Sequence, residues 1–295
     1  MLNTRKIKFN MQNIIYLIFV PTFVYLGIFF LYPIYISIKY SFTNISLTDI
    51  LNYTYIGFSN YHSLLTSGSF IGSIYTTIIF LVLSAIIGQM FLGIVVAYLL
   101  SVTQKYFRLI ITSIILVAWA TPQVTAGIMW YSTLSYIPSG TVNVFLNYFG
   151  IHSINFLSLH LALISIIIAN VWLGLGFSVL IFSSGISGIS PSIIKASRID
   201  GANPFTRFFK IILPLLKKSI ITDLLLITLF TLGAFTLVFV MTGGGPVNAT
   251  DIMTIYQYRA GFSLFSLGIA NAVGVIIIVL AISISILYLI SLKGD

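Results

Sequence analysis

Long hydrophobic runs with almost no charged residues alternate with shorter polar segments along this chain. Six runs extend over about 14–38, 72–100, 109–131, 159–182, 219–241 and 264–291. Since a helix needs about 20 apolar residues to cross roughly 30 Å of hydrocarbon, each run predicts a membrane-spanning helix. Pro21, Pro33 and Pro122 fall inside or near the ends of these runs, where membrane helices tolerate kinks. The pattern predicts an all-α, polytopic membrane protein of about six spans.

The polar segments between the runs are short. No fixed-period repeat and no low-complexity linker divides the chain, so residues 1–295 are expected to form a single domain. The predicted outer loops, about 39–71, 132–158 and 242–263, are too small to be separate binding or catalytic domains. Capture of a ligand from outside would therefore require a partner protein.

Basic residues are concentrated in alternate polar segments. With the N-terminus in the cytoplasm, twelve Lys and Arg residues fall in cytoplasmic segments, and only Lys39 and Arg259 fall outside. This asymmetry predicts a multi-pass protein with both termini in the cytoplasm. The basic stretch Arg5–Lys8 precedes 30 uncharged residues, Phe9–Ile38, which is long for a cleaved signal peptide. We expect a retained first span.

Composition excludes a water-soluble domain. Hydrophobic residues make up 59% of the chain and charged residues 6%, whereas a soluble domain carries roughly a quarter of its residues charged. The net charge of +9 does not indicate nucleic-acid binding, because the basic residues flank apolar runs and form no stripe with stacking aromatics. We therefore expect this chain to be surrounded by membrane lipid.

The sequence offers no catalytic constellation. There is no cysteine, and His62, His152 and His160 have no metal-ligand spacing. A Walker A sequence is missing, so this chain is not expected to hydrolyse ATP. We expect no enzyme activity, no metal and no cofactor on this chain.

The polar segment 183–218 has an internal order that a simple charge anchor does not explain. Ser190-Pro191 predicts the start of one short helix, Gly201 permits a sharp turn, and Asn203-Pro204 predicts the start of a second. Pro214 is expected to end the second helix before the fifth span. Its expected apolar face consists of Phe205, Phe208, Phe209 and Ile212.

Residues 195–214, KASRIDGANPFTRFFKIILP, resemble the cytoplasmic "EAA" loop of ABC importer permeases. That pattern reads E-A-A-x-x-D-G-A-x5-F-x2-I-x-L-P, and eight of its ten fixed positions match. Lys195 replaces the Glu and Ser197 replaces an Ala. The resemblance implies that the loop docks on an ATP-hydrolysing subunit. It implies coupling roles for Lys195, Ala196, Asp200, Gly201, Ala202, Phe208 and Pro214.

Asp200 has two interpretations in this loop. We expect it to cap the second helix or to hydrogen-bond in the turn, and the alternative is a salt bridge to the ATPase. Asp223, near the start of the fifth run, also has two interpretations. We expect it to form an ion pair with Lys217 or Lys218, and the alternative is a proton relay.

Residues 241–272 resemble a second signature, that of carbohydrate-uptake permeases of the maltose and glycerol-3-phosphate type. The matching residues are Thr242, Gly244, Gly245, Pro246, Thr250, Tyr258, Phe262, Gly268, Ala270 and Ala272. The resemblance implies a type I ABC importer permease fold and half of a sugar pore, for a mono- or oligosaccharide. It also implies two ATP-binding subunits that hold ATP and Mg, a second homologous permease, an extracytoplasmic sugar-binding protein and a prokaryotic cell membrane.

The fourth run carries a possible substrate-pathway segment. Asn170-Val171-Trp172-Leu173-Gly174-x-x-Phe177 resembles the N-x-W-L-G-x-x-Y run of the maltose transporter's larger permease. This implies Asn170 as a hydrogen-bonding group, Trp172 and Phe177 as packing or stacking groups, and Gly174 as a point of backbone approach. For Asn170 the alternative is an interhelical hydrogen bond.

The fifth run adds Phe230, Thr231 and Ala234 to the expected pathway, with ordinary helix packing as the alternative. Further candidates are Gln89, Thr121 and Gln123, of which Gln89 could equally bond a neighbouring helix.

Two other functions would leave different residues in the membrane-spanning runs. A transporter driven by an ion gradient would carry a mid-span acid or Arg and inverted repeats. An ABC permease for a phosphate ester or another non-sugar solute would favour a basic residue in the pore. Neither feature is evident in the runs.

Overall fold

The computed structural model describes residues 11–136 and 140–293, and in these ranges the fold is built from helices, with isolated β-bridges and no strand. Arg5, Lys6 and Lys8, which contribute to the predicted orientation, lie outside the described residues. The all-α prediction is confirmed.

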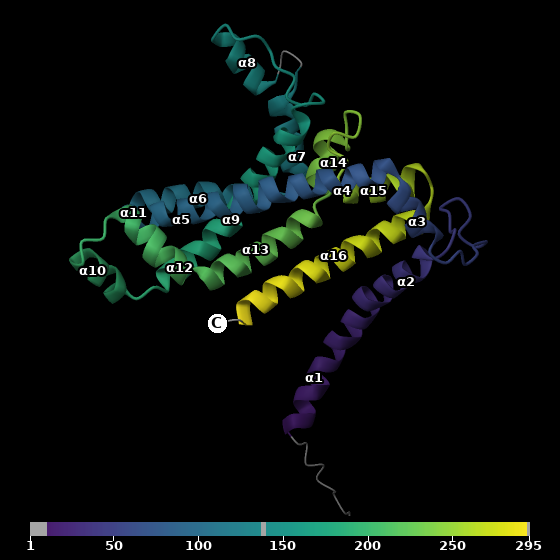
Figure 1. The fold of residues 1–295 in the computed structure, drawn as a ribbon, viewed down its shortest axis with the longest axis horizontal. Coiled ribbons are helices and arrows are strands. Elements are labelled where there is room, and N and C mark those ends of the chain that lie inside the picture. Colours follow the sequence, from purple (N-terminus) through teal and green to yellow (C-terminus); the bar gives the residue numbers. More distant parts are fainter. Residues whose placement is uncertain (1–10, 137–139, 294–295) are drawn as a thin grey trace, which may run out of the picture.

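Within residues 11–136 and 140–293, four helical segments are long and apolar enough to cross a membrane. The first consists of α1 (Met11–Leu26), a π-helical turn η1 (Gly27–Leu31) and α2 (Tyr32–Ser41), and α1 lies apart from the remaining helices (Figure 1). The second joins α4 (Gly68–Leu81), η2 (Val82–Phe91) and α5 (Leu92–Val102). The others are α9 (Ala162–Ser187) and α16 (Leu267–Lys293).

The third and fifth predicted spans are broken. The chain bends by 102° between α6 (Lys105–Ala120) and α7 (Gln123–Leu134). It bends by 46° between α13 (Lys217–Leu232) and α14 (Thr236–Thr242). The predicted span over 109–131 bends next to Pro122, where the sequence indicates a kink, because the residue before the proline adopts an extended conformation, with ψ 127° at Thr121. Counting each bent pair as one span gives up to six in the described chain.

The break in the fifth span lies at Gly233-Ala234. Chain bending frees backbone carbonyls that a membrane cannot hydrate. The carbonyl of Ala234 accepts a hydrogen bond of 2.5 Å from Oγ1 of Thr254, on α15 (Met253–Tyr258). A side chain from a different element thus stabilises the bend.

Short helices lie at the two ends of the bundle. α3 (Ser59–Thr66) and α15 lie at one end, with α15 followed by η4 (Arg259–Ser263) (Figure 1). The other end holds α10 (Pro191–Ile199), α11 (Pro204–Arg207), η3 (Phe208–Ile212) and α12 (Leu213–Leu215), together with the last described turn of α16. The remaining short helix, α8 (Thr141–Tyr148), follows α7.

α9 is the central helix, because it packs on α5, α6, α7, α13, α14 and η2. Small residues allow this close contact. A Cβ at Gly176 would lie 2.7 Å from Cβ of Trp119 on α6, and a Cβ at Gly93 of α5 would lie 2.6 Å from Cβ of Ser178 on α9. Small residues at helix contacts are typical of membrane bundles, where van der Waals packing replaces the hydrophobic effect.

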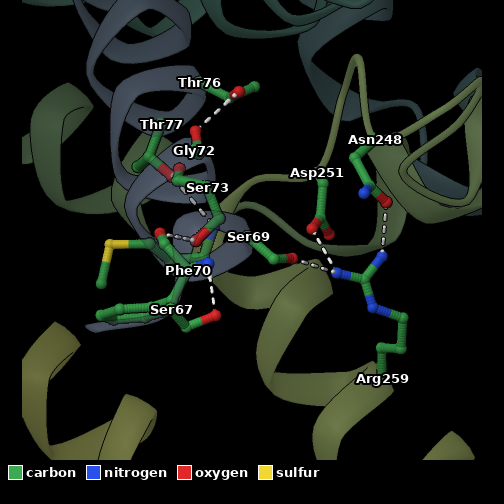
Figure 2. Close-up of polar contacts among 11 residues, drawn as sticks. Ser67, Ser69, Phe70, Gly72, Ser73, Thr76, Thr77, Asn248, Asp251 and Arg259 are labelled. Atoms are coloured by element: carbon green, nitrogen blue, oxygen red, sulfur yellow. Dashed lines mark hydrogen bonds and ion pairs between the residues drawn. The ribbon is translucent and has the colours of Figure 1, made fainter. Parts of the chain in front are cut away.

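A charged network stabilises the corner after α14 (Figure 2). Arg259 donates to Asn248 Oδ1 at 2.8 Å and to Asp251 Oδ2 at 2.5 Å. Asp251 is almost fully buried, so desolvation raises its pKa, and the adjacent guanidinium opposes that shift. Gly243 and Gly244 have φ of 58° and 91°, in the left-handed region, so the chain forms a tight, non-helical corner there.

Candidate functional site

A cavity of about 460 Å³ lies where the two broken spans meet α9. Its wall includes Thr121 and Gln123 at the α6–α7 break, and Gly233 and Ala234 at the α13–α14 break. The volume is within the range of small-molecule sites, about 300–1,000 Å³. Both departures from regular helix therefore open onto the same space.

The structure brings most of the predicted pathway residues together. Six of the seven line this cavity: Asn170, Gly174, Phe177, Phe230, Thr231 and Ala234. The further candidates Gln89, Thr121 and Gln123 line it as well.

Trp172 does not line the cavity. It packs against the core cluster, with its ring centroid 6.0 Å from that of Trp130 on α7. Its position follows from helix geometry, since residues 170, 174 and 177 share one face of α9 and residue 172 points elsewhere. Of the two roles expected for Trp172, the structure supports packing.

Asn170 joins α9 to the second span. Its Nδ2 donates to Ser84 Oγ at 3.0 Å, and its backbone carbonyl accepts a bond of 3.0 Å from Gln89 Nε2. The interhelical alternative is therefore present, and Asn170 is 8% exposed. Gln89 likewise bonds a neighbouring helix while lining the cavity.

Gly174 is the point where Gln89 crosses α9. A Cβ at this position would overlap the amide carbon, oxygen and nitrogen of the Gln89 side chain. Gly174 is expected to allow close approach to the backbone of α9. In the structure, the side chain of Gln89 makes that approach. This contact fixes the Gln89 amide at the cavity wall.

Aromatic rings form another part of the wall. The centroid of Phe177 lies 6.1 Å from that of Trp119 and 5.7 Å from that of Phe230. Phe230 is 65% exposed, so its ring borders the open space. Flat aromatic faces beside amide groups suit the alternating C–H and hydroxyl surfaces of a sugar.

Sequence reasoning missed part of the lining. The missed residues are Trp119, Leu173, Ile227, Leu229, Gly233 and Leu237. Of these, Trp119 had a usable signal, because it lies three residues before Pro122 and hence next to a predicted kink.

No ionisable side chain lines this cavity in the described part of the protein. The polar groups are amides, hydroxyls and backbone atoms. Such a surface can hydrogen-bond a neutral polar molecule and offers no counter-charge to an anion.

The segment between α9 and α13 forms two short helices around a glycine turn, as predicted. Ser190 Oγ caps α10 through the backbone N–H of Ser192, and Asn203 Oδ1 caps α11 through the N–H of Thr206 at 2.7 Å. Gly201 has φ of 77°, in the left-handed region. Ser197, at the Ala position of the pattern, donates its hydroxyl to the carbonyl of Ile194.

Two details of this segment differ from the prediction. Pro214 lies inside α12, and the chain leaves the helix at Leu216. The four apolar residues do not share one buried face: Phe208 and Ile212 are buried, whereas Phe205 is 72% exposed. The π-helical register of η3 rotates the residues after Arg207 away from the regular helical face.

The residues for which a coupling role is expected divide into buried and exposed groups. Phe208 contacts Tyr98 of α5, with ring centroids 4.8 Å apart, and so attaches the segment to the bundle. The backbone of Ala202 accepts a bond from Arg207, while Lys195, Ala196 and Gly201 are exposed.

The carboxylate of Asp200 is exposed and makes no hydrogen bond within the described residues, so its expected capping role is wrong. Asn203 supplies that cap. Asp223 also departs from expectation: it is fully buried, and neither carboxylate oxygen has a hydrogen-bond partner among residues 11–136 and 140–293. The predicted pair with Lys217 or Lys218 is not formed there.

The comparisons with known proteins agree with this architecture. A family described as binding-protein-dependent transport system inner membrane component matches residues 89–293. MalF, a trehalose/maltose transport system permease protein of Thermococcus litoralis, is 30% identical over 287 residues, covering 97% of this chain and 96% of MalF. SmoG, a sulfoquinovosyl glycerol transport system permease protein of Agrobacterium fabrum, is 30% identical, covering 97% of this chain and 92% of SmoG.

UgpA, an sn-glycerol-3-phosphate transport system permease protein of Yersinia pseudotuberculosis, is 29% identical, covering 92% of each chain. Among solved structures, a chain of a bacterial alginate ABC transporter, crystallised with an alginate pentasaccharide-bound periplasmic protein, superposes with a TM-score of 0.81. The two chains are 23% identical, with 93% of this chain and 92% of the other covered. They share a fold.

Proposed function

This chain belongs to the family of binding-protein-dependent transport system inner membrane components, and we propose that it imports a sugar as half of the pore of an ATP-driven transporter. It is a multi-pass membrane permease with the fold of an ABC importer subunit. The proposal concerns the substrate, the partner subunits and the orientation of the chain in the membrane. Membership in this family argues against the ion-driven alternative.

The observation that carries the sugar proposal is the uncharged cavity at the two helix breaks. It combines the amide of Gln89 with the rings of Phe177 and Phe230, and none of its lining residues is ionisable. A neutral carbohydrate finds hydrogen-bonding groups and flat apolar faces there.

A second candidate substrate is an anionic solute such as a phosphate ester. The relationship to UgpA favours it, since that protein is named for sn-glycerol-3-phosphate transport. A buried anion requires a compensating charge, and the described cavity wall provides none. The neutral sugar is therefore the better match.

The exposed segment 195–214 is proposed to couple this chain to an ATPase. α10 and its glycine turn project from the end of the bundle, while Phe208 anchors the segment to α5 (Figure 1). An exposed tip on a rigid base can transmit the movement of a docked subunit. In this proposal two partner ATPases bind ATP and Mg and carry out the hydrolysis.

Two further partners complete the proposed transporter. A second, homologous permease supplies the other half of the pore, as the 65% exposure of Phe230 at the cavity edge suggests. An extracytoplasmic binding protein delivers the sugar, since the outer segments of this chain are short loops and helices. We place the complex in a prokaryotic cell membrane with both termini cytoplasmic, consistent with the excess of Lys and Arg on that side.

The proposal is tested by reconstituting the complex and measuring ATP hydrolysis and sugar uptake with a sugar-loaded binding protein. Stimulation of hydrolysis by a loaded binding protein is expected. Phe230→Ala should lower uptake about tenfold, equivalent to roughly 1.4 kcal/mol, because one wall of the cavity is removed. Phe91→Ala is the matched control, since Phe91 is 56% exposed and lies outside the cavity.

Three results would contradict the proposal. They are an absence of any copurifying ATPase, stimulation by a phosphate ester but by no sugar, and equal loss of uptake in Phe230→Ala and Phe91→Ala. The last would mean that the cavity does not contact the substrate.

A further inference from the structure

A second cavity, of about 690 Å³, lies beside α10, at the end of the bundle where the coupling segment projects. Its walls come from α5, α6, α9 and α10. The spans contribute an apolar part of the wall, which includes Ala97, Leu100, Leu109 and Leu180. It shares no lining residue with the cavity at the helix breaks.

Three cationic side chains, Arg108, Lys195 and Arg198, line the same cavity. Arg108 comes from the first turn of α6, and the other two come from α10, so the fold unites charges far apart in the sequence. No carboxylate is among the lining residues, and within the described chain none of the three side chains forms an ion pair or a hydrogen bond.

Like charges around one cavity raise its positive potential, which an anion relieves. The lining also offers hydroxyl groups from Thr112 and Ser183, whereas the hydroxyls of Ser101 and Ser187 donate to the backbone carbonyls of Tyr98 and Ser183. Hydroxyls and guanidinium groups together are typical donors to phosphate oxygens. The polar part of the cavity therefore suits a phosphate group.

The apolar part distinguishes a phospholipid from a free anion. Inorganic phosphate would use only the cations and hydroxyls, leaving the surface around Leu109 and Leu180 without a ligand contact. Both leucines are substantially exposed, at 57% and 37%. Basic pockets between membrane helices on the cytoplasmic side are known binding sites for anionic lipid headgroups.

We propose that this cavity binds an anionic phospholipid, with its phosphate among Arg108, Lys195 and Arg198 and an acyl chain along Leu109 and Leu180. Only the assignment to the cytoplasmic leaflet rests on the orientation proposed above. At Lys195 the family pattern has a Glu, whose negative charge would repel the phosphate, so this departure has a physical consequence here.

The test is a titration of the detergent-purified, assembled complex with phosphatidylglycerol, phosphatidylcholine and inorganic phosphate, followed by native mass spectrometry and by the unfolding midpoint. Phosphatidylglycerol should bind and raise the midpoint, and the other two should not. Arg108→Gln and Arg198→Gln, made separately, should each weaken lipid binding about fivefold, the effect of one interfacial cation.

Lys105→Gln is the matched control, because Lys105 begins the same helix as Arg108 but does not line the cavity. Equal weakening by Lys105→Gln would overturn the proposal in favour of diffuse surface charge. Equal binding of phosphatidylcholine, or competition by inorganic phosphate at the affinity of the lipid, would also overturn it. So would unchanged lipid binding in both arginine variants, or lipid binding only when the ATPase is removed, which would make the cations an ATPase contact.

Discussion

At the scale of single residues, the contact between Gln89 and Gly174 depends on a missing methyl group. Gly174→Ala would place its Cβ inside the Gln89 amide and break the bond from Gln89 to the Asn170 carbonyl. We expect a loss of about 1–3 kcal/mol in the free energy of unfolding, the usual cost of overpacking. The unfolding midpoint of the purified complex measures it.

A double variant separates this steric effect from a general loss of helix stability. Gly174→Ala combined with Gln89→Ala should be more stable than the sum of the single changes predicts, because the clash is removed. Gly72→Ala in α4 is the control: its Cβ meets open space, so it should be neutral or slightly stabilising. Strict additivity in the double variant would show that the two residues do not collide.

The cavity residues on α9 could be predicted from sequence because helical spacing alone puts positions 170, 174 and 177 on one face. The same spacing excludes Trp172, although the resemblance included it. Pro122 indicates a kink beside Trp119, but helical spacing alone does not place Trp119 in the cavity wall. Its contribution depends on the angle at the α6–α7 break, which long-range packing of α7 on α14 determines.

At the scale of elements, the number and order of the spans could be predicted, but their straightness could not. Pro122 marks a kink in the sequence, yet a proline fixes only the local backbone and not a 102° angle. The fifth span gives even less warning, since Gly233 is a common residue in membrane helices. Its bend is stabilised by Thr254, twenty residues further along the chain.

The turn between α10 and α11 gives a prediction at this scale. Gly201→Ala places a Cβ on a residue with φ of 77°, which costs about 1–2 kcal/mol in the left-handed region. The turn should open, and binding-protein-stimulated ATP hydrolysis should fall about fivefold or more, while the complex still assembles.

Gly57→Ala provides the comparison for this experiment. Gly57 also has a left-handed backbone, with φ of 59°, and a Cβ there meets open space, but it lies in the loop before α3, at the opposite end of the bundle from α10. Gly57→Ala should lower the free energy of unfolding to a similar degree but leave the stimulation of ATP hydrolysis unchanged. A Gly201→Ala complex with unimpaired stimulation would remove the turn from the coupling mechanism.

At the scale of the whole molecule, the proposed orientation in the membrane rests on the distribution of charge, and the lack of cysteine makes that orientation measurable. Leu51 and Ile199 are 90% and 86% exposed, at opposite ends of the bundle. In intact cells, a membrane-impermeant maleimide should label Leu51→Cys and not Ile199→Cys. Opening the membrane should make Ile199→Cys reactive.

Val247→Cys is a second outer position, 85% exposed in the corner after α14, and should label like Leu51→Cys. Labelling of Ile199→Cys in intact cells would reverse the proposed topology. Shielding of Ile199→Cys by a coexpressed ATPase would support docking at α10 in the same experiment.

The packing of the two bent spans has a mechanical consequence. α14 packs chiefly on α7, where a Cβ at Gly127 would come within 2.8 Å of Val240, whereas α13 packs on α16, η2 and α9. The two halves of the fifth span thus have different main neighbours, although both also contact α9, and the cavity lies at the bend between them. A change in the bend angle would move Phe230 and Thr231 relative to Leu237, so it would change the width of the cavity and the contacts of a bound molecule.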